Sequence, residues 1–281
     1  MSSFLNKHKM TPLRSVIKKS LIQMTGNWFS QGLLEEIVQT VHILQGVGGG
    51  SVGASEVQTS GERSIFDLMK RRNNPPYCMF DIGANRGQFL HLLLENIATD
   101  EYSIHCFEPG QAAFMVLCDA FSYDKKITLN NIGIGKECCN SVLHYDAAGS
   151  GCASLTKRNL DHLGIFFDKC EPIAITTLDD YCSAKDISRI HLMKMDVEGH
   201  ELDALNGARS MFDRRLIDIV SFEFGGCNVD TRTYFQDFWY FFAEADMKLF
   251  RITPSGYLYP VESYSEIHEK FGVSNYVAVS G

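Results

Sequence analysis

The sequence predicts a doubly wound α/β domain built on an open, mostly parallel sheet. From residue 77 onward, short apolar runs alternate with amphipathic segments, as strands alternate with crossover helices. Polar or glycine-containing segments directly follow several of these runs, where such sheets bind their ligands. The composition, 45% hydrophobic and 21% charged, is that of an ordinary globular protein and excludes disordered and fibrous classes.

The expected elements follow from this alternation. Five apolar runs predict the parallel strands: YCMFDI, YSIHCF, ITLNNIGI, IHLMKMDV and LIDIVSFEF. MKLFRIT and SNYVAVS predict two closing strands, and helices are expected near residues 86–98, 111–120, 200–213 and 233–245. Residues 141–176 break the rhythm with short runs separated by Gly and Ser. This stretch predicts a β-rich insertion.

Residues 1–60 predict an N-terminal helical arm and glycine-rich linker, and residues 61–281 the α/β domain. Thr11 and Pro12 begin a short basic amphipathic helix, and a second helix is expected over residues 31–45. The run GVGGGSVGAS follows that helix. No strand precedes the run and no Gly-Lys-Ser/Thr follows it, so it favours a flexible linker over a phosphate-binding loop.

Charge and cysteine content bound the partners and the compartment. The net charge of −8 argues against nucleic acid as the main partner. Residues 1–34 hold five basic residues and no acid, so two interpretations of the first helix stay open: packing on the body, or a weak contact with an anionic membrane surface. The sequence has no apolar run of ~18 residues and no signal-peptide pattern, and we expect a cytoplasmic protein without a transmembrane segment. Nine cysteines without C-x-x-C or zinc spacing fit reduced thiols and no metal site.

Two strand ends point to a nucleoside ligand. The first strand ends in FDIGANRGQF, where Gly83 and Gly87 permit a tight turn beside Asp81. The Gly-x-x-x-Gly spacing differs from G-x-G-x-x-G and argues against NAD and FAD. The second strand ends in CFEPG, with Glu108 near the distance at which an acid meets ribose hydroxyls. Together the two motifs predict an adenosine-type ligand.

Four segments, FDIGANRGQF, CFEPG, ITTLDDYC and KMDVEGHE, resemble in their order and spacing the FkbM family of S-adenosylmethionine-dependent methyltransferases. The resemblance covers about residues 77–280, and TLDDY followed by MKMDVEGHE is its most specific part. It implies a Rossmann-like class I methyltransferase fold and bound S-adenosyl-L-methionine. Carried over by position, it places the cofactor loop on Asp81, Gly83, Asn85 and Gly87, the ribose-binding acid on Glu108, and the adenine contact on Asn131 and Ile132.

The candidate catalytic residues follow the fourth and fifth strands. KMDVEGHE places Asp196 toward the cofactor's sulfonium and amino-acid end, with Glu198 and His200 around the following helix start. SFEFGG leaves Glu223 at the edge of the same cleft. Paired carboxylates raise one another's pKa, which suits a base that takes a proton from an alcohol. For Glu201, helix capping and catalysis both stay open, and for His200 a positioning or surface role is favoured.

These observations predict an O-methyltransferase that acts on a hydroxyl of a small-molecule or glycan acceptor, either a sugar or a polyketide-like product. Two alternatives remain. One is an N-methyltransferase of an amine or peptide, because an already nucleophilic nitrogen also suits the carboxylates. The other is a non-catalytic protein that binds S-adenosylmethionine.

Overall fold

The computed structural model describes residues 12–47, 60–72 and 74–281, and the chain divides into two compact units, Met1–Ile43 and Leu44–Gly281. The first unit holds α1 (Pro12–Met24) and nearly all of α2 (Trp28–Leu44), close to the two expected helices. Most of the glycine-rich run lies outside the described residues. Within the described ranges, no helix has the length and apolarity needed to cross a membrane.

The second unit is built on an eight-stranded sheet in the order β10-β9-β11-β8-β7-β1-β2-β3. The strands are β1 (Tyr77–Ile82), β2 (Tyr102–Phe107), β3 (Ile127–Asn130), β7 (Leu192–Met195), β8 (Ile219–Phe224), β9 (Met247–Ile252), β10 (Leu258–Pro260) and β11 (Ser274–Ser280). The run from β8 to β3 is parallel, and β11 inserts antiparallel between β8 and β9. The chain reverses its direction of travel across the sheet at β1, which creates a crevice at the strands' carboxyl ends.

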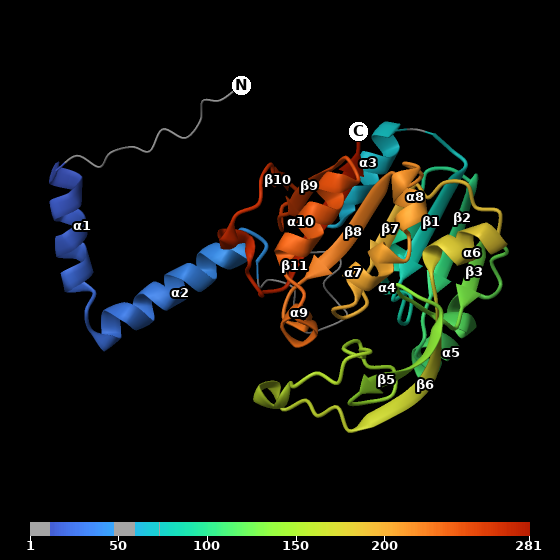
Figure 1. Cartoon of the computed structure of the whole chain (residues 1–281), viewed down its shortest axis with the longest axis horizontal. Coiled ribbons are helices and arrows are strands. Elements are labelled where there is room, and N and C mark those ends of the chain that lie inside the picture. The colour runs from blue at the N-terminus through green and yellow to red at the C-terminus, as the bar shows by residue number, and fades with distance from the viewer. Residues whose placement is uncertain (1–11, 48–59, 73) are drawn as a thin grey trace. The chain divides into compact units, whose positions relative to one another are not determined.

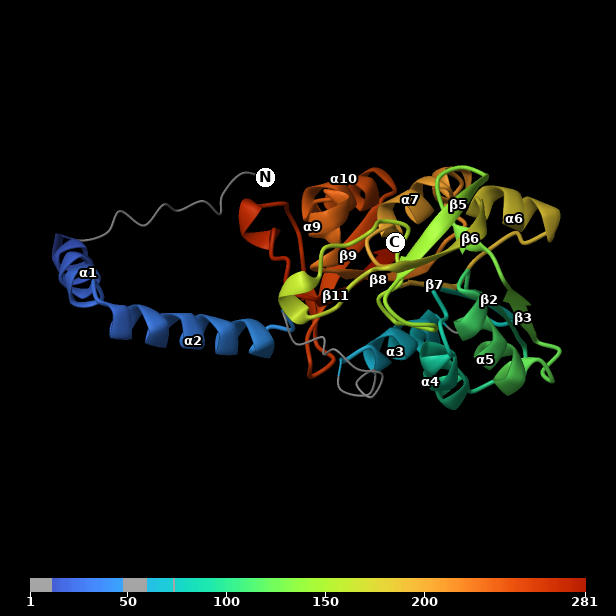
Figure 2. The same ribbon diagram turned by 90° about the horizontal axis from the view of Figure 1, so that it is seen from below.

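Helices cover both faces of the sheet (Figures 1 and 2). One face carries α3 (Arg63–Arg72), α4 (Gln88–Asn96) and α5 (Gln111–Phe121). The other carries α6 (Leu178–Ala184), α7 (Glu201–Asn206), α8 (Arg209–Asp213) and α10 (Phe235–Glu244), with the short α9 (Cys227–Thr231) after β8. The doubly wound prediction is therefore confirmed, and the helix over residues 63–72 is an addition to it.

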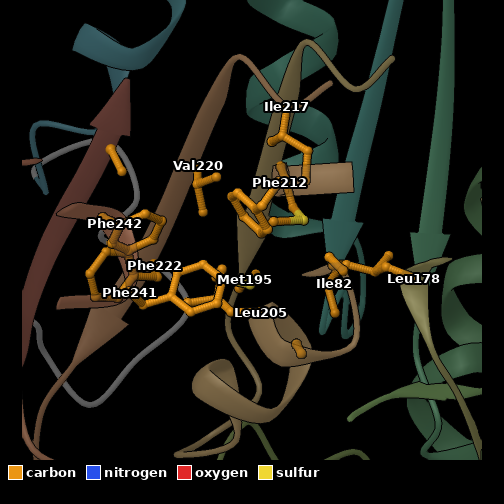
Figure 3. Packing of buried hydrophobic residues seen from close by; sticks show 14 of the residues in the cluster. Ile82, Leu178, Met195, Leu205, Phe212, Ile217, Val220, Phe222, Phe241 and Phe242 are labelled. Atoms are coloured by element: carbon orange, nitrogen blue, oxygen red, sulfur yellow. The ribbon is translucent and has the colours of Figure 1, made fainter. Parts of the chain in front are cut away.

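Aromatic packing holds the second helix layer to the sheet. The Phe222 ring on β8 stacks on Phe238 and Phe242 of α10, with ring centroids 4.8 and 5.4 Å apart. Figure 3 shows Phe222 and Phe242 in the same cluster as Phe212, Met195 and other buried side chains of β7 and α8. Strands buried on both faces read as nearly continuous apolar runs, which is why β7 and β8 stood out in the sequence.

The expected insertion forms a second sheet, ordered β4-β6-β5, from β4 (Gly133–Ile134), β5 (Cys139–Tyr145) and β6 (Lys169–Thr176). The 3₁₀ turn η1 (Asp161–Leu163) lies between its two long strands, and η2 (Glu266–His268) precedes β11. The run ITLNNIGI is split between the two sheets, because the Asn131 side chain donates to the Glu108 and Pro109 carbonyl oxygens and turns the chain. The expected helix over residues 200–213 breaks near Gly207, where a Cβ would lie 2.1 Å from the Gly135 carbonyl oxygen.

We propose that the α/β domain folds without the first compact unit. Deleting residues 1–43 should leave the melting temperature within about 2 °C of the full chain, because the sheet and its helix layers stay complete. Deleting residues 1–60 should lower it further, because that deletion also removes Val47, a buried side chain of the second unit. Thermal unfolding of the three proteins measures this. A large loss from the shorter deletion would contradict an independent domain.

Candidate active site

The turn after β1 is tightly enclosed by its neighbours. The backbone N–H groups of Gly83 and Ala84 both donate to the Phe107 carbonyl oxygen, at 2.9 and 3.0 Å. Gly83 has φ of 82°, and a Cβ there would lie 1.9 Å from the Asp196 carbonyl oxygen. Only glycine fits this position, and it brings the ends of β1, β2 and β7 together.

Glu108, directly after β2, is held by the same turn. Its Oε2 accepts from the Asn85 N–H at 2.9 Å, and its Oε1 accepts from the Gly110 N–H at 2.7 Å. Burial raises the pKa of Glu108 to about 7, although the two N–H donors favour the carboxylate. The carboxylate is thus fixed in orientation, and its remaining lone pairs can accept further hydrogen bonds.

A row of charged side chains crosses the ends of β1, β7 and β8. Asp81 on β1 lies in register with Lys194 on β7, and Glu223 follows two residues after the β8 partner of Lys194. Lys194 Nζ is 3.5 Å from Asp196 Oδ2. Burial raises the pKa of Asp81 to about 7, with Lys194 opposing it. Burial lowers the pKa of Lys194, but the surrounding carboxylates outweigh that effect and the ammonium stays charged.

The insertion contributes an arginine that pairs with two further carboxylates. Arg158 is almost fully buried, ion-pairs with Glu198, and reaches Asp230 with its Nε 3.3 Å from Oδ2. Burial and the neighbouring Asp196 raise the pKa of Glu198, and Arg158 opposes this rise. Burial, Asp196 and Glu198 also raise the pKa of Glu223 well above its ordinary value. In the described part of the chain, the Glu223 carboxylate has neither a hydrogen bond nor an ion pair.

Two residues near the start of α7 have structural partners. His200 Nδ1 lies 2.8 Å from Asp203 Oδ2, and its Nε2 lies 3.0 Å from Thr156 Oγ1. Both ring nitrogens are therefore occupied, as a positioning role requires. Glu201 Oε1 accepts from the N–H groups of Val197 and Gly199 at 3.1 and 3.2 Å, which matches the helix-start interpretation.

One cavity of about 1020 Å³ lies at this site. It is lined by most of the residues selected from the sequence: Asp81, Gly83, Asn85, Glu108, Ile132, Asp196, Glu198, His200 and Glu223. Gly87 and Asn131 are not among the lining residues. A Cβ on Gly87 would lie 2.5 Å from the Phe121 ring, so Gly87 permits packing of α4 against α5. Asn131 supports the Glu108 loop through the two carbonyl bonds described above.

Sequence reasoning missed five charged lining residues: Glu62, Arg86, Arg158, Lys194 and Asp230. The lysine within the apolar run IHLMKMDV could have been recognised from the sequence. A lysine buried in a strand is costly unless acidic groups pair with it, so it indicates a cluster of charges. Glu62 and Arg158 had no comparable signal, since each reaches the cavity from a segment remote in sequence. Across residues 12–47, 60–72 and 74–281, no cluster of His, Cys, Asp and Glu side chains has an arrangement suited to a metal ion.

The strand order, the glycine turn after β1 and the acid after β2 define a class I methyltransferase fold. The profile of the Methyltransferase FkbM domain matches residues 81–249, more than half of the chain. The chain therefore belongs to the FkbM family of methyltransferases. No curated protein matches the chain as a whole or in part.

Solved structures of methyltransferases are similar at low identity. Methyltransferase FkbM from Methylobacillus flagellatus is 17% identical, with a TM-score of 0.42, over 74% of this chain and 46% of that one. This chain thus spans less than half the length of that protein. A TehB-like SAM-dependent methyltransferase from Corynebacterium glutamicum is 12% identical, with a TM-score of 0.38 and coverage of 88% and 97%. The plantazolicin methyltransferase BpumL, in complex with SAH, is 8% identical, with a TM-score of 0.36 and coverage of 89% and 100%.

The raised pKa of Asp81 predicts a pH-dependent cost in stability. A buried acid whose folded pKa exceeds its unfolded value lowers stability as pH rises between the two values, here from about 4 to about 7. At pH 5 only the lower part of this window has been crossed, so the gain in stability from Asp81→Asn should be smaller there than at pH 8. At pH 8, without ligand, the variant should be more stable by on the order of 1–4 kcal/mol.

Thermal unfolding at both pH values measures this effect. Asp67→Asn, on the exposed side of α3, is the control and should show no pH-dependent gain. The same difference between Asp81→Asn and wild type at both pH values would contradict burial of an ionisable Asp81.

Proposed function

We propose that the protein is an S-adenosylmethionine-dependent O-methyltransferase that acts on a hydroxyl of a small-molecule or glycan acceptor, either a sugar or a polyketide-like product. Membership of the FkbM family supports methyl transfer. The observation that carries the proposal is that Glu108 and the β1 turn line the same cavity as Glu198 and Glu223. A cofactor and an acceptor can meet there at carboxylates with raised pKa values.

The lining residues suit S-adenosylmethionine. Glu108 presents a pre-oriented carboxylate, the type of group that holds ribose hydroxyls. Gly83 leaves space where a side chain would block the turn. Asp81 Oδ2 is buried without a hydrogen-bond partner in the described residues, and an acidic wall favours a cationic ligand.

When bound, the cofactor supplies a methyl group activated by a cationic sulfur. The chain must then align the acceptor oxygen, exclude water and take the hydroxyl proton. We propose Glu223 as the proton acceptor, since its carboxylate lines the cavity and has no hydrogen bond or ion pair with the described residues. Glu198 is committed to Arg158 and fixes the insertion over the cavity. Asp196 lies on the cofactor side beside Lys194, and His200 positions the loop through Thr156.

Transfer of a labelled methyl group to a panel of acceptors tests the assignment. Wild-type protein incubated with labelled cofactor and hydroxylated glycans, polyketide-like alcohols, amines or no acceptor should label alcohols. Labelling of amines alone would favour the N-methyltransferase alternative. Cofactor binding without transfer to any acceptor class would favour a non-catalytic binding protein.

Glu108→Ala should weaken S-adenosylmethionine binding by about 1–3 kcal/mol, because ribose hydroxyls would lose a charged acceptor in a buried site. Isothermal titration calorimetry measures the change. Glu101→Ala, exposed at the opposite end of β2, is the control and should bind like wild type. Unchanged affinity in a folded Glu108→Ala protein would remove Glu108 from the cofactor site.

Glu223→Gln should lower kcat by roughly 10²–10⁴ while cofactor affinity stays near wild type, because the amide keeps the shape but cannot accept the proton. The wild-type rate should rise with pH through the raised pKa of Glu223, since only the ionised form is a base. The amide variant should lose this dependence.

Glu198→Gln is the matched comparison, because the same substitution there leaves Glu223 intact. We expect it to lose less kcat than Glu223→Gln. The reverse order of losses would identify Glu198 as the base and Glu223 as a supporting acid.

A further inference from the structure

The register of the sheet places two opposite charges on one face at the cavity floor. Asp81 and Lys194 alternate with the buried apolar residues Met79 and Leu192, which pack under α3 and α4. Side chains two residues apart on a strand share a face. The Lys194 ammonium therefore lies on the α3/α4 side of the cavity, 6.0 Å from the Phe89 ring centroid.

Glu62, from the segment before α3, covers this ammonium. It is 4% exposed and lines the cavity, and its Oε2 accepts from the Ser60 hydroxyl at 2.8 Å. Glu62 Oε1 has no hydrogen-bond partner among the described residues and lies 3.8 Å from Lys194 Nζ. A buried carboxylate oxygen aimed into a cavity without a hydrogen bond is costly unless a ligand or water completes it.

The Lys194 ammonium also has unused donor capacity. Its contacts with Asp196, Glu62 and the Met195 carbonyl oxygen are long, at 3.5, 3.8 and 3.5 Å. An ammonium has three donors, and charged hydrogen bonds normally measure about 2.7–2.9 Å. The pair therefore offers a donor and an acceptor, each incompletely used, side by side in the same cavity.

We propose that Glu62 and Lys194 form a subsite for a zwitterionic α-amino acid group, the methionine end of the cofactor. Glu62 Oε1 takes the ligand's ammonium, and Lys194 Nζ takes its carboxylate. This inference rests on the proposed function.

The strand order supports this placement. The ribose-type acid Glu108 follows β2, and Lys194 lies on β7, so the two sit on opposite sides of β1. A ligand that spans the end of β1 would present its ribose to Glu108 and its amino acid group to Lys194.

The excess of carboxylates around Lys194 favours binding of a cationic ligand group at Glu62 over a simple Glu62–Lys194 ion pair. Four carboxylates act on the single ammonium of Lys194 and raise its pKa: Glu62, Asp81, Asp196 and Glu223. The surplus of negative charge is costly in a buried site and is reduced by the ammonium of a ligand. Glu62 lies outside the matched region 81–249, so the subsite extends the cofactor pocket beyond the family's domain profile.

The first experiment compares two ligands on wild-type protein by calorimetry. S-adenosylhomocysteine carries the amino acid group, and 5′-methylthioadenosine lacks it but keeps the adenosine. We expect the second ligand to bind about 10- to 100-fold more weakly, the effect of losing charged hydrogen bonds. Equal affinities would overturn the subsite. Failure of wild-type protein to bind either ligand would overturn the proposed function, and the subsite with it.

The second experiment assigns the effect to the two residues. Glu62→Gln and Lys194→Met should each lower S-adenosylhomocysteine affinity about 10- to 100-fold and leave 5′-methylthioadenosine affinity within about 3-fold. Glu95→Gln, exposed on α4, is the matched control and should change neither value. Equal losses for both ligands in the folded Glu62→Gln protein would indicate a purely structural role and overturn the proposal. Should Lys194→Met not fold, the Glu62→Gln protein decides the question.

Discussion

The close approach of Gly83 to the Asp196 carbonyl oxygen is the constraint on which the site depends. The turn after β1 is wedged between the end of β2, where the Phe107 carbonyl accepts two of its N–H groups, and the end of β7. A side chain at Gly83 would force these ends apart. With glycine there, Glu108, Asp81 and Asp196 face one crevice, although they come from three strands.

That crevice concentrates negative charge where water is scarce. Asp81 and Glu108 are buried, and both have raised pKa values because the ionised form loses hydration. Lys194 compensates only part of this charge. The free protein therefore carries an electrostatic cost that a cationic ligand relieves, which links low stability of the empty site to affinity for its ligand. Arg158 plays the corresponding part on the insertion side, where it pairs with both Glu198 and Asp230 and offsets part of their charge.

The sequence predicted the sheet well because its strands are buried on both faces. The runs YCMFDI and YSIHCF coincide with β1 and β2, and the glycine turn and Glu108 follow from local spacing. The division of ITLNNIGI between two sheets was not predictable, because it depends on side-chain bonds from Asn131 to the loop after β2. Glu62 and Arg158 were missed for a similar reason. Their partners, Lys194 and Glu198, lie far away in sequence, and neither residue belongs to a recognisable local motif.

We propose that one crevice at the end of β1 holds S-adenosylmethionine from Glu108 to Lys194. A crystal structure of the protein with S-adenosylhomocysteine tests this most directly. We expect ribose oxygens within hydrogen-bond distance of Glu108, the amino acid group between Glu62 and Lys194, and the sulfur facing Glu223. Density for the ligand in another cavity, or with its amino acid end directed away from β7, would contradict it.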